Sequence, residues 1–282
     1  MTALADPHSA LLACQSLLAL ALILFSFEDR KLIKDTLAEP CFAWHVLGHD
    51  LKALWPRSFR LLAWCFDPQR LNRLLLLRTL CALLMLGGIA NDGLRACSLL
   101  MLWVSQVLMM VRWRGALNGG SDIMTLSLLN ALMIGETFNL SAQLFDRPES
   151  DLGNRISLWF IVIQSLSAYV ISGAVKLREK AWRDGRALIH FLNHAIYGPL
   201  QPRSLFRRRS VSMAVSWSFI LWECSMPCLL LHPQVAIVAC AIALVFHGLV
   251  FWFFGLNRFF WTWISCLPAL MFASYAMSPL SV

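Results

Sequence analysis

Charged side chains are scarce in this sequence. Asp, Glu, Lys and Arg together make up 14% of the 282 residues, whereas hydrophobic residues make up 59%. A soluble globular domain carries about 25% charged and 45–50% apolar residues. The shortage of charge therefore excludes a soluble enzyme, a disordered chain and a small secreted domain held by disulfides. It predicts an all-α integral membrane protein, with no room for a further soluble domain of the usual ~100–150 residues.

Several sequence motifs of soluble enzymes are also missing. Gly119-Gly120 is too short to be a phosphate-binding loop, and His190 and His194 lack the glutamate of a zinc-protease motif. We therefore expect no metal site. The net charge of +8 does not indicate nucleic acid, because basic residues of membrane proteins gather in cytoplasmic loops. The absence of an inverted repeat argues against a transporter.

The cysteines say little about redox chemistry. All but Cys41 and Cys65 fall inside apolar runs, where a thiol behaves as a small hydrophobe. Cys224 and Cys228 are four residues apart and share a helix face, which is not the C-x-x-C spacing of thiol oxidoreductases. The sequence allows a disulfide bridge between Cys41 and Cys65 but gives no support for it.

Long apolar segments divide the chain into about eight predicted membrane spans. A bilayer core about 30 Å thick needs roughly 20 mostly apolar residues in a helix. The first segment is interpreted as a span and not as a cleavable signal peptide, because it lacks a basic start and is followed by Glu28-Asp29-Arg30. The predicted spans are Ser9–Phe27, Leu71–Asn91, Ala96–Val111, Ser121–Leu140, Ile156–Leu177, Val211–Leu231, Gln234–Trp252 and Phe259–Ser278.

Residues 28–72 mix charges with tryptophan and phenylalanine. Their two short apolar pieces, Pro40–Leu47 and Ser58–Phe66, are too short to span and predict an interfacial or re-entrant segment after the first helix. The basic residues concentrate in loops 28–73 and 178–210, so the charge count places both termini outside the cytoplasm. Loop 178–210 is expected to hold a short helix around Arg186–Ala195.

Titratable residues inside the spans are the candidates for function, since each costs a few kcal/mol to bury in a membrane. They are Arg78, Asp122, Glu136, Lys176, Glu223 and His247. Ser121 or Asp122 is expected to cap the start of the fourth span, which is an ordinary structural role.

Lys176 ends a helical face that also carries Tyr169 and Ser172 or Gly173. A lysine partly removed from water can act as a base. The alternative is that it extends its ammonium to the interface. Glu223 needs a cation, a donor or a proton, from His247, Arg78 or Lys176, and a structural ion pair is the alternative to catalysis. His247 is either a neutral, hydrogen-bonded side chain or a proton carrier.

Several motifs together resemble one family. Tyr169-x3-Gly173-x2-Lys176-Leu177-x4-Trp182-x2-Gly185-x-Ala187 is similar to an element of the HTTM (horizontally transferred transmembrane) domain. Weaker similarities lie at Ala53–Arg57, Asn118–Asp122, Glu223-x3-Pro227 and Phe246-His247-Gly248. The resemblance covers about residues 45–275 and implies a single HTTM-like transmembrane domain over 1–282. This family includes the membrane part of vitamin K-dependent gamma-carboxylase and bacterial proteins of the sporulation-delaying-protein B type.

The resemblance implies an enzyme-like cavity in a multi-pass protein of a bacterial inner or plasma membrane. Lys176 would be the catalytic base, with His247 and Glu223 relaying protons or holding the substrate. Tyr169, Gly173 and Trp182 would bind the cofactor, a quinone or reduced vitamin K. A secreted peptide or protein would be the substrate. The aromatic residues of the late spans can line an apolar pocket or simply face lipid; they are Trp217, Phe219, Trp222, Phe251, Trp252, Phe253 and Phe254.

Two departures argue against true gamma-carboxylation. Asn118-Gly-Gly-Ser stands where the carboxylase has an Asn-His pair, and the 282 residues hold no counterpart of its large extramembrane domain. The carboxylase lysine also works on the non-cytoplasmic side, opposite to the side that the charge count gives for Lys176. A non-enzymatic membrane partner, chaperone or immunity-like protein is therefore the alternative function.

Overall fold

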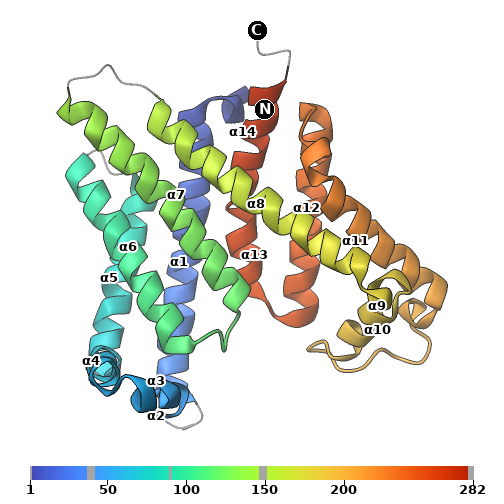
Figure 1. The fold of residues 1–282 in the computed structure, drawn as a ribbon, viewed down its shortest axis with the longest axis horizontal. Coiled ribbons are helices and arrows are strands. Elements are labelled where there is room, and N and C mark those ends of the chain that lie inside the picture. Colours follow the sequence, from blue (N-terminus) through green and yellow to red (C-terminus); the bar gives the residue numbers. More distant parts are fainter. Residues whose placement is uncertain (1, 37–41, 89–90, 146–150, 279–282) are drawn as a thin grey trace. The chain divides into compact units, whose positions relative to one another are not determined.

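The fold is described from a computed structural model, which covers residues 2–36, 42–88, 91–145 and 151–278. Every regular element in these ranges is a helix (Figure 1), as the composition predicts. The chain divides into two compact units. The α5–α7 unit comprises residues 12–157 and 261–265, and the α8–α12 unit comprises residues 1–11, 158–260 and 266–282.

Long helices build the α5–α7 unit. They are most of α1 (Pro7–Thr36), followed by α5 (Pro68–Gly87), α6 (Asp92–Trp113) and α7 (Gly119–Leu144), with the first turns of α8 (Leu152–Arg178). Helices α5 and α6 follow one another along the chain and pack side by side in opposite directions (Figure 1), and Arg78 near the middle of α5 donates to Gln106 of α6 at 2.7 Å. Arg30 of α1 bonds Asn72 of α5 at 2.8 Å.

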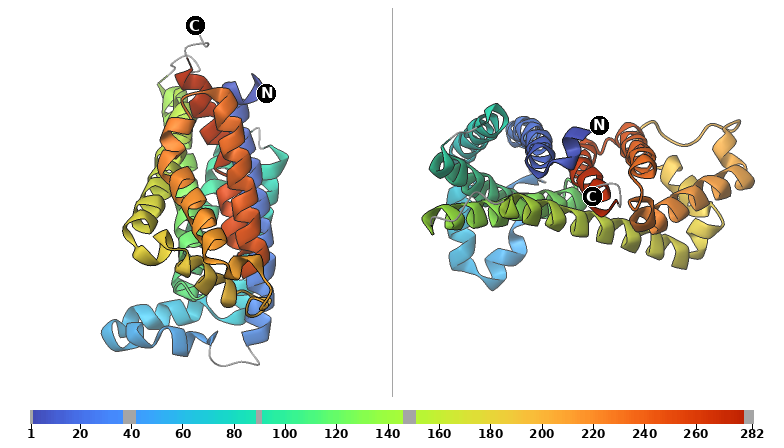
Figure 2. Two further views of the ribbon diagram at one scale, coloured as in Figure 1. Left: turned by 90° about the vertical axis from the view of Figure 1, so that its right-hand side faces the viewer. Right: turned by 90° about the horizontal axis from the view of Figure 1, so that it is seen from above.

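Three short helices follow α1 in the same unit. They are α2 (Trp44–Leu47), α3 (His49–Leu54) and α4 (Pro56–Cys65), and they lie crosswise to the long helices at one end of the unit (Figure 2). The ring of Trp44 stacks on Phe59 and meets the edge of Phe66, with centroids 5.6 and 4.7 Å apart. None of these helices is long enough to span a membrane, which agrees with the short apolar pieces in the sequence.

The α8–α12 unit contains the rest of α8 and the elements after it. These are α9 (Lys180–Arg183), α10 (Arg186–Asn193), the 3-10 turn η3 (Leu205–Arg207), α11 (Arg209–Leu229), α12 (Pro233–Phe254) and α14 (Leu267–Met277), against which η1 (Thr2–Ala5) packs. Helix α13 (Asn257–Ile264) belongs partly to each unit. The short helix expected around Arg186–Ala195 is confirmed as α10, and α11 and α12 form the helical hairpin that the turn at Leu231–Pro233 predicts.

In the part of the chain that the structure describes, six helical segments, and not the eight predicted, are long and apolar enough to cross a membrane. They are α1, α6, α7, α8, α12 and the α13–α14 pair. Helix α5 carries Arg70, Arg73 and Arg78 within its 20 residues. In α11, serines, Glu223 and Pro227 lower the mean hydropathy. These are the two predicted spans that composition does not support.

The start of α7 differs from the prediction. The capping residue is Asn118, whose side-chain oxygen accepts from the backbone N–H groups of Gly120 and Ser121 at 3.1 and 3.3 Å. Ser121 instead donates its hydroxyl to the Asn118 carbonyl at 2.9 Å, and Asp122 lies in the first turn. The helix begins almost a turn earlier than expected because asparagine is itself a strong N-cap. Cys41, and with it the bridge to Cys65, lies outside the described residues.

Candidate functional site

An ion pair between α8 and α11 forms the centre of the candidate site. The Lys176 Nζ lies 2.8 and 2.7 Å from the two carboxylate oxygens of Glu223, and it donates to the Ser172 Oγ at 2.5 Å. The Ser172 hydroxyl also donates to Glu223 Oε1, at 3.2 Å. The side chains of Lys176 and Glu223 are 14% and 3% exposed. The ammonium is therefore turned inward to the protein, with an acceptor for each of its three hydrogens.

Two glycines make this close approach of helices feasible. A Cβ atom added to Gly173 would lie 2.7 Å from Cys224 Sγ and 2.9 Å from the Cys224 backbone nitrogen. Gly185 has φ +77°, and a Cβ there would meet the backbone of Met213 at 2.6 Å. The glycines therefore seat α8 and the α9–α10 turn directly on the backbone of α11. Gly173 therefore serves the site by allowing α8 and α11 to contact each other.

A second polar pair joins Tyr169 of α8, about two helix turns before Lys176, to His247 of α12. The phenol oxygen and the imidazole Nε2 are 2.9 Å apart, and both side chains are buried. The ring of Trp222, the neighbour of Glu223 in α11, meets Tyr169 edge to face with centroids 5.1 Å apart. His247 is also in ring contact with Phe246 and Phe259. The histidine thus sits in an aromatic setting, and the Tyr169 hydroxyl is a polar partner of its ring.

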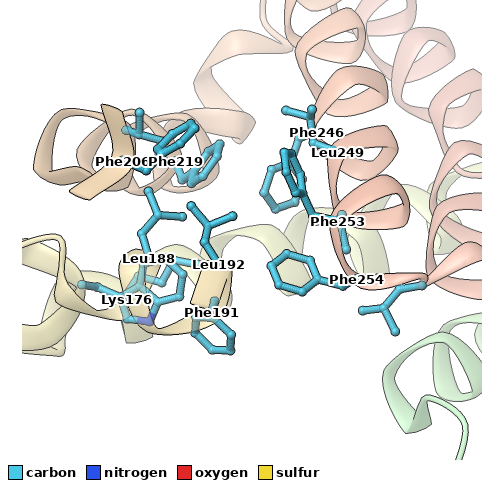
Figure 3. A pocket seen from close by; sticks show the side chains of 14 residues that line it. Lys176, Leu188, Phe191, Leu192, Phe206, Phe219, Phe246, Leu249, Phe253 and Phe254 are labelled. Atoms are coloured by element: carbon cyan, nitrogen blue, oxygen red, sulfur yellow. The ribbon is translucent and has the colours of Figure 1, made fainter. Parts of the chain in front are cut away.

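A cavity of about 410 Å³ lies beside the ion pair. Figure 3 shows α10 side chains on one side of it, facing aromatic side chains of α12. Of the described residues that line it, Lys176 alone carries a charge. The lining residues are Lys176, Trp182, Leu188, Phe191, Leu192, Phe206, Val215, Phe219, Phe246, Leu249, Val250, Phe253, Phe254 and Leu256.

Trp182 connects the ion pair to the cavity wall. The Lys176 Nζ lies 5.4 Å from the centroid of the Trp182 ring, within the range of a cation–π contact. The same ring stacks on Phe191 of α10, with centroids 5.6 Å apart. Arg183 donates to the carbonyls of Leu177 and Arg178, which satisfies the C-terminal end of α8.

The turn from α9 to α10 is held by a short-range ion pair outside the spans. Asp184 accepts from the backbone N–H of Arg186 at 3.2 Å and from its guanidinium at 2.8 Å. Partial desolvation alone would raise the pKa of Asp184, but the hydrogen bonds and the charge of Arg186, together with the charge of Arg209, lower the pKa below its usual value.

The remaining titratable candidates belong to the α5–α7 unit and have structural partners there. Glu136 accepts from Arg95 Nε at 3.0 and 2.9 Å, and Arg95 also pairs with Asp92 at 2.6 Å. Arg78 bonds Gln106, which in turn donates to the backbone carbonyl of Asp122 at 3.4 Å. These contacts join neighbouring helices of the unit, which is the ordinary structural role of buried charge.

The sequence does not predict some of the contacts in either unit. Arg95, the partner of Glu136, was expected between spans and lies in α6. The α10 residues Leu188, Phe191 and Leu192 were not predicted as cavity lining. Their i, i+3 and i+4 spacing was the available signal, because it gives α10 a continuous apolar face. His190 in α10 and His194, one turn later at the C-terminal cap of that helix, have ring centroids 4.4 Å apart. Among the described residues no group of three or more His, Cys, Asp or Glu side chains could hold a metal ion.

Comparisons of the chain with models of protein families, with curated proteins and with solved structures found no match.

Proposed function

We propose that this multi-pass membrane protein is an enzyme that binds a quinol and acts in the modification or maturation of an exported peptide or protein. The observation that carries the proposal is the Lys176–Glu223 ion pair beside an apolar, aromatic cavity. The exported substrate and the carboxylase-like character of the fold come from the resemblance to the HTTM family.

The cavity suits a flat, lipid-soluble ring. Its volume of about 410 Å³ falls within the range of small-molecule sites, roughly 300–1,000 Å³. Phe191, Phe219, Phe246 and Phe253 supply aromatic faces, and Trp182 adds a larger one. A quinol presents an apolar ring and two hydroxyl groups, so one hydroxyl can meet Lys176 while the ring packs against phenylalanine.

Lys176 becomes a base only after it loses a proton, because the ion pair holds it as an ammonium. Glu223 is the acceptor in reach, since Oε2 lies 2.7 Å from Nζ. Transfer of one proton along this contact leaves a neutral amine and a neutral carboxylic acid. An apolar occupant that displaces water from the cavity favours the neutral pair, because a low dielectric penalises both charges. The amine then accepts a proton from the bound hydroxyl.

Tyr169 and His247 would hold or relay a proton beyond this pair. Tyr169 shares its face of α8 with Ser172 and Lys176, and its ring contacts Trp222, next to Glu223. Gly173 positions the carboxylate by letting α11 approach, and Trp182 forms part of the cavity wall.

A non-enzymatic membrane partner or chaperone is the second candidate. The observation that favours it is the complete set of acceptors around the ammonium: Ser172 and both oxygens of Glu223. A lysine whose three ammonium hydrogens all have acceptors inside the protein also fits a purely structural ion pair.

The two candidates separate in one experiment. The purified protein in nanodiscs is supplied with reduced vitamin K under air, and the quinol is followed by its fluorescence. We expect oxidation above the spontaneous rate with the unmodified chain, and loss of that excess with Lys176→Met. Lys180→Met, which removes an exposed lysine four residues away, is the matched control and should retain the rate. The enzymatic proposal is refuted if no excess oxidation occurs, or if Lys176→Met oxidises the quinol as fast as Lys180→Met.

A further inference from the structure

We propose that the outer face of α3 and α4 is a binding surface for anionic phospholipid headgroups. This surface consists of Leu54, Trp55, Arg57, Arg60, Leu61 and Trp64, and it lies in the α5–α7 unit. The proposal is independent of the quinol site, which the other unit contains.

The inner face of α4 is already occupied by the protein. Phe59 stacks on Trp44, and Leu62 and Ala63 pack against the same buried cluster, which includes Phe66. Arg114 at the end of α6 pairs with Asp50 at 3.4 Å and adds a link to α3. The orientation of α4 about its own axis is therefore set, and its other face must point away from the unit.

Large apolar side chains are exposed on this outward face and at the junction of α3 and α4. Leu54 is 74% exposed and Trp55 is 64% exposed, and Leu61 and Trp64 are also exposed. Leu61 and Trp64 lie three residues apart on α4, so they form one patch and not scattered single residues. Tryptophan is enriched where a membrane meets water, because its ring is apolar and its N–H is polar.

Two arginines lie among these apolar residues. Arg57 is four residues before Leu61, and Arg60 is four residues before Trp64, so all four share the outward side of α4. Both arginines are exposed, and in the part of the chain that the structure describes neither makes an ion pair. Their guanidinium groups have the donor geometry that matches phosphate.

Arg70 at the start of α5 fixes one of the tryptophans. Its guanidinium carbon lies 4.1 Å from the centroid of the Trp64 ring, and its Nη1 donates to the Trp64 carbonyl at 3.0 Å. The exposed ring is thus held at the surface by a third arginine, and the entropy cost of ordering it is reduced before any lipid binds.

The position of the surface matches the headgroup layer. Ile33 near the end of α1 and Trp113 at the end of α6 belong to the same buried cluster as Trp44, so α2–α4 lie at the level where two candidate spans end. These short helices run crosswise to the spans (Figure 2), as a helix in the membrane interface does. The charge count of loop 28–73 also predicts that this end faces the cytoplasm, where the membrane leaflet carries anionic lipids.

The test measures lipid affinity on the intact protein in detergent. Phosphatidylglycerol and phosphatidylcholine are titrated separately, and bound lipid is counted by native mass spectrometry. One arginine near an anionic surface corresponds to about a fivefold change in affinity. We therefore expect Arg57→Gln/Arg60→Gln to weaken phosphatidylglycerol binding roughly 30-fold and to leave phosphatidylcholine binding unchanged. Added salt should weaken phosphatidylglycerol binding to the unmodified chain.

The matched control is Arg203→Gln/Arg208→Gln, which removes two exposed arginines from the other unit. Hydrogen exchange in nanodiscs gives the location: the amides of residues 57–65 should be better protected with phosphatidylglycerol than with phosphatidylcholine alone, and the α4 variant should lose this difference. The proposal is overturned if the unmodified chain has no preference for phosphatidylglycerol, if the control loses the preference equally, or if the α4 variant keeps it.

Discussion

Replacing Glu223 by Gln removes one charge from the buried pair and keeps the size of the side chain. Lys176 then retains Ser172 and a neutral amide oxygen, with 14% of its side chain exposed. Removing one partner of a buried ion pair costs about 3–5 kcal/mol, because the other charge stays buried without compensation. We expect about 3 kcal/mol here, the low end of that range, since water reaches part of the lysine.

The double variant Lys176→Met/Glu223→Gln removes both charges and should recover most of this loss. The free energy of unfolding is measured for the unmodified chain, the two single variants and the double variant, which gives the coupling between the two side chains. We expect a coupling of about 1–3 kcal/mol. A coupling below about 0.5 kcal/mol would show that the two groups are independently solvated, and the site geometry used above would be wrong.

Three further perturbations test the local structure. Gly173→Ala should destabilise the protein by about 1–3 kcal/mol in thermal unfolding, because the added Cβ would lie 2.7 Å from the Cys224 sulfur. Gly87→Ala is the control: the added Cβ has open space around it, so this variant should be neutral or slightly stabilising. Asn118→Ala should lower the free energy of unfolding by about 1 kcal/mol through loss of the α7 cap, and an unchanged value would contradict the hydrogen bonds to Gly120 and Ser121. The folded pKa of Asp184 is lowered, so its stabilising contribution to the α9–α10 turn is present above the unfolded pKa of about 3.9 and is lost as the pH falls through the folded pKa. Hydrogen exchange of the amides in this turn should therefore rise on acidification. Asp184→Asn should abolish that pH dependence.

The sequence predicts the helices better than their contacts. The apolar runs in α1 and α12 are unambiguous, because a long stretch without charge has few alternatives to a membrane helix. Helix α5 shows where that reasoning weakens: it packs antiparallel to α6 although three arginines reduce its apolar character. Whether such a helix spans the membrane depends on which neighbouring side chains accept hydrogen bonds from its arginines. Those contacts follow from the packing of the whole unit.

The candidate site was predictable only as far as it depends on a single helix. The spacing of Tyr169, Ser172 and Lys176 places them on one face from α8 alone. The choice of Lys176 among the three cations considered for Glu223 depends on the register between α8 and α11. Gly173 and Gly185 set that register, and their role becomes visible only when the opposing backbone is present.

Pro227 stands four residues after Glu223 inside α11. Proline has no N–H, so the main-chain carbonyl of Glu223 lacks the helical donor that its neighbours have, and the proline ring crowds that carbonyl. The turn that bears the carboxylate is therefore the place where α11 bends most easily. If a ligand widens the adjacent cavity, α11 would bend at this turn, while its N-terminal half stays packed against Gly185.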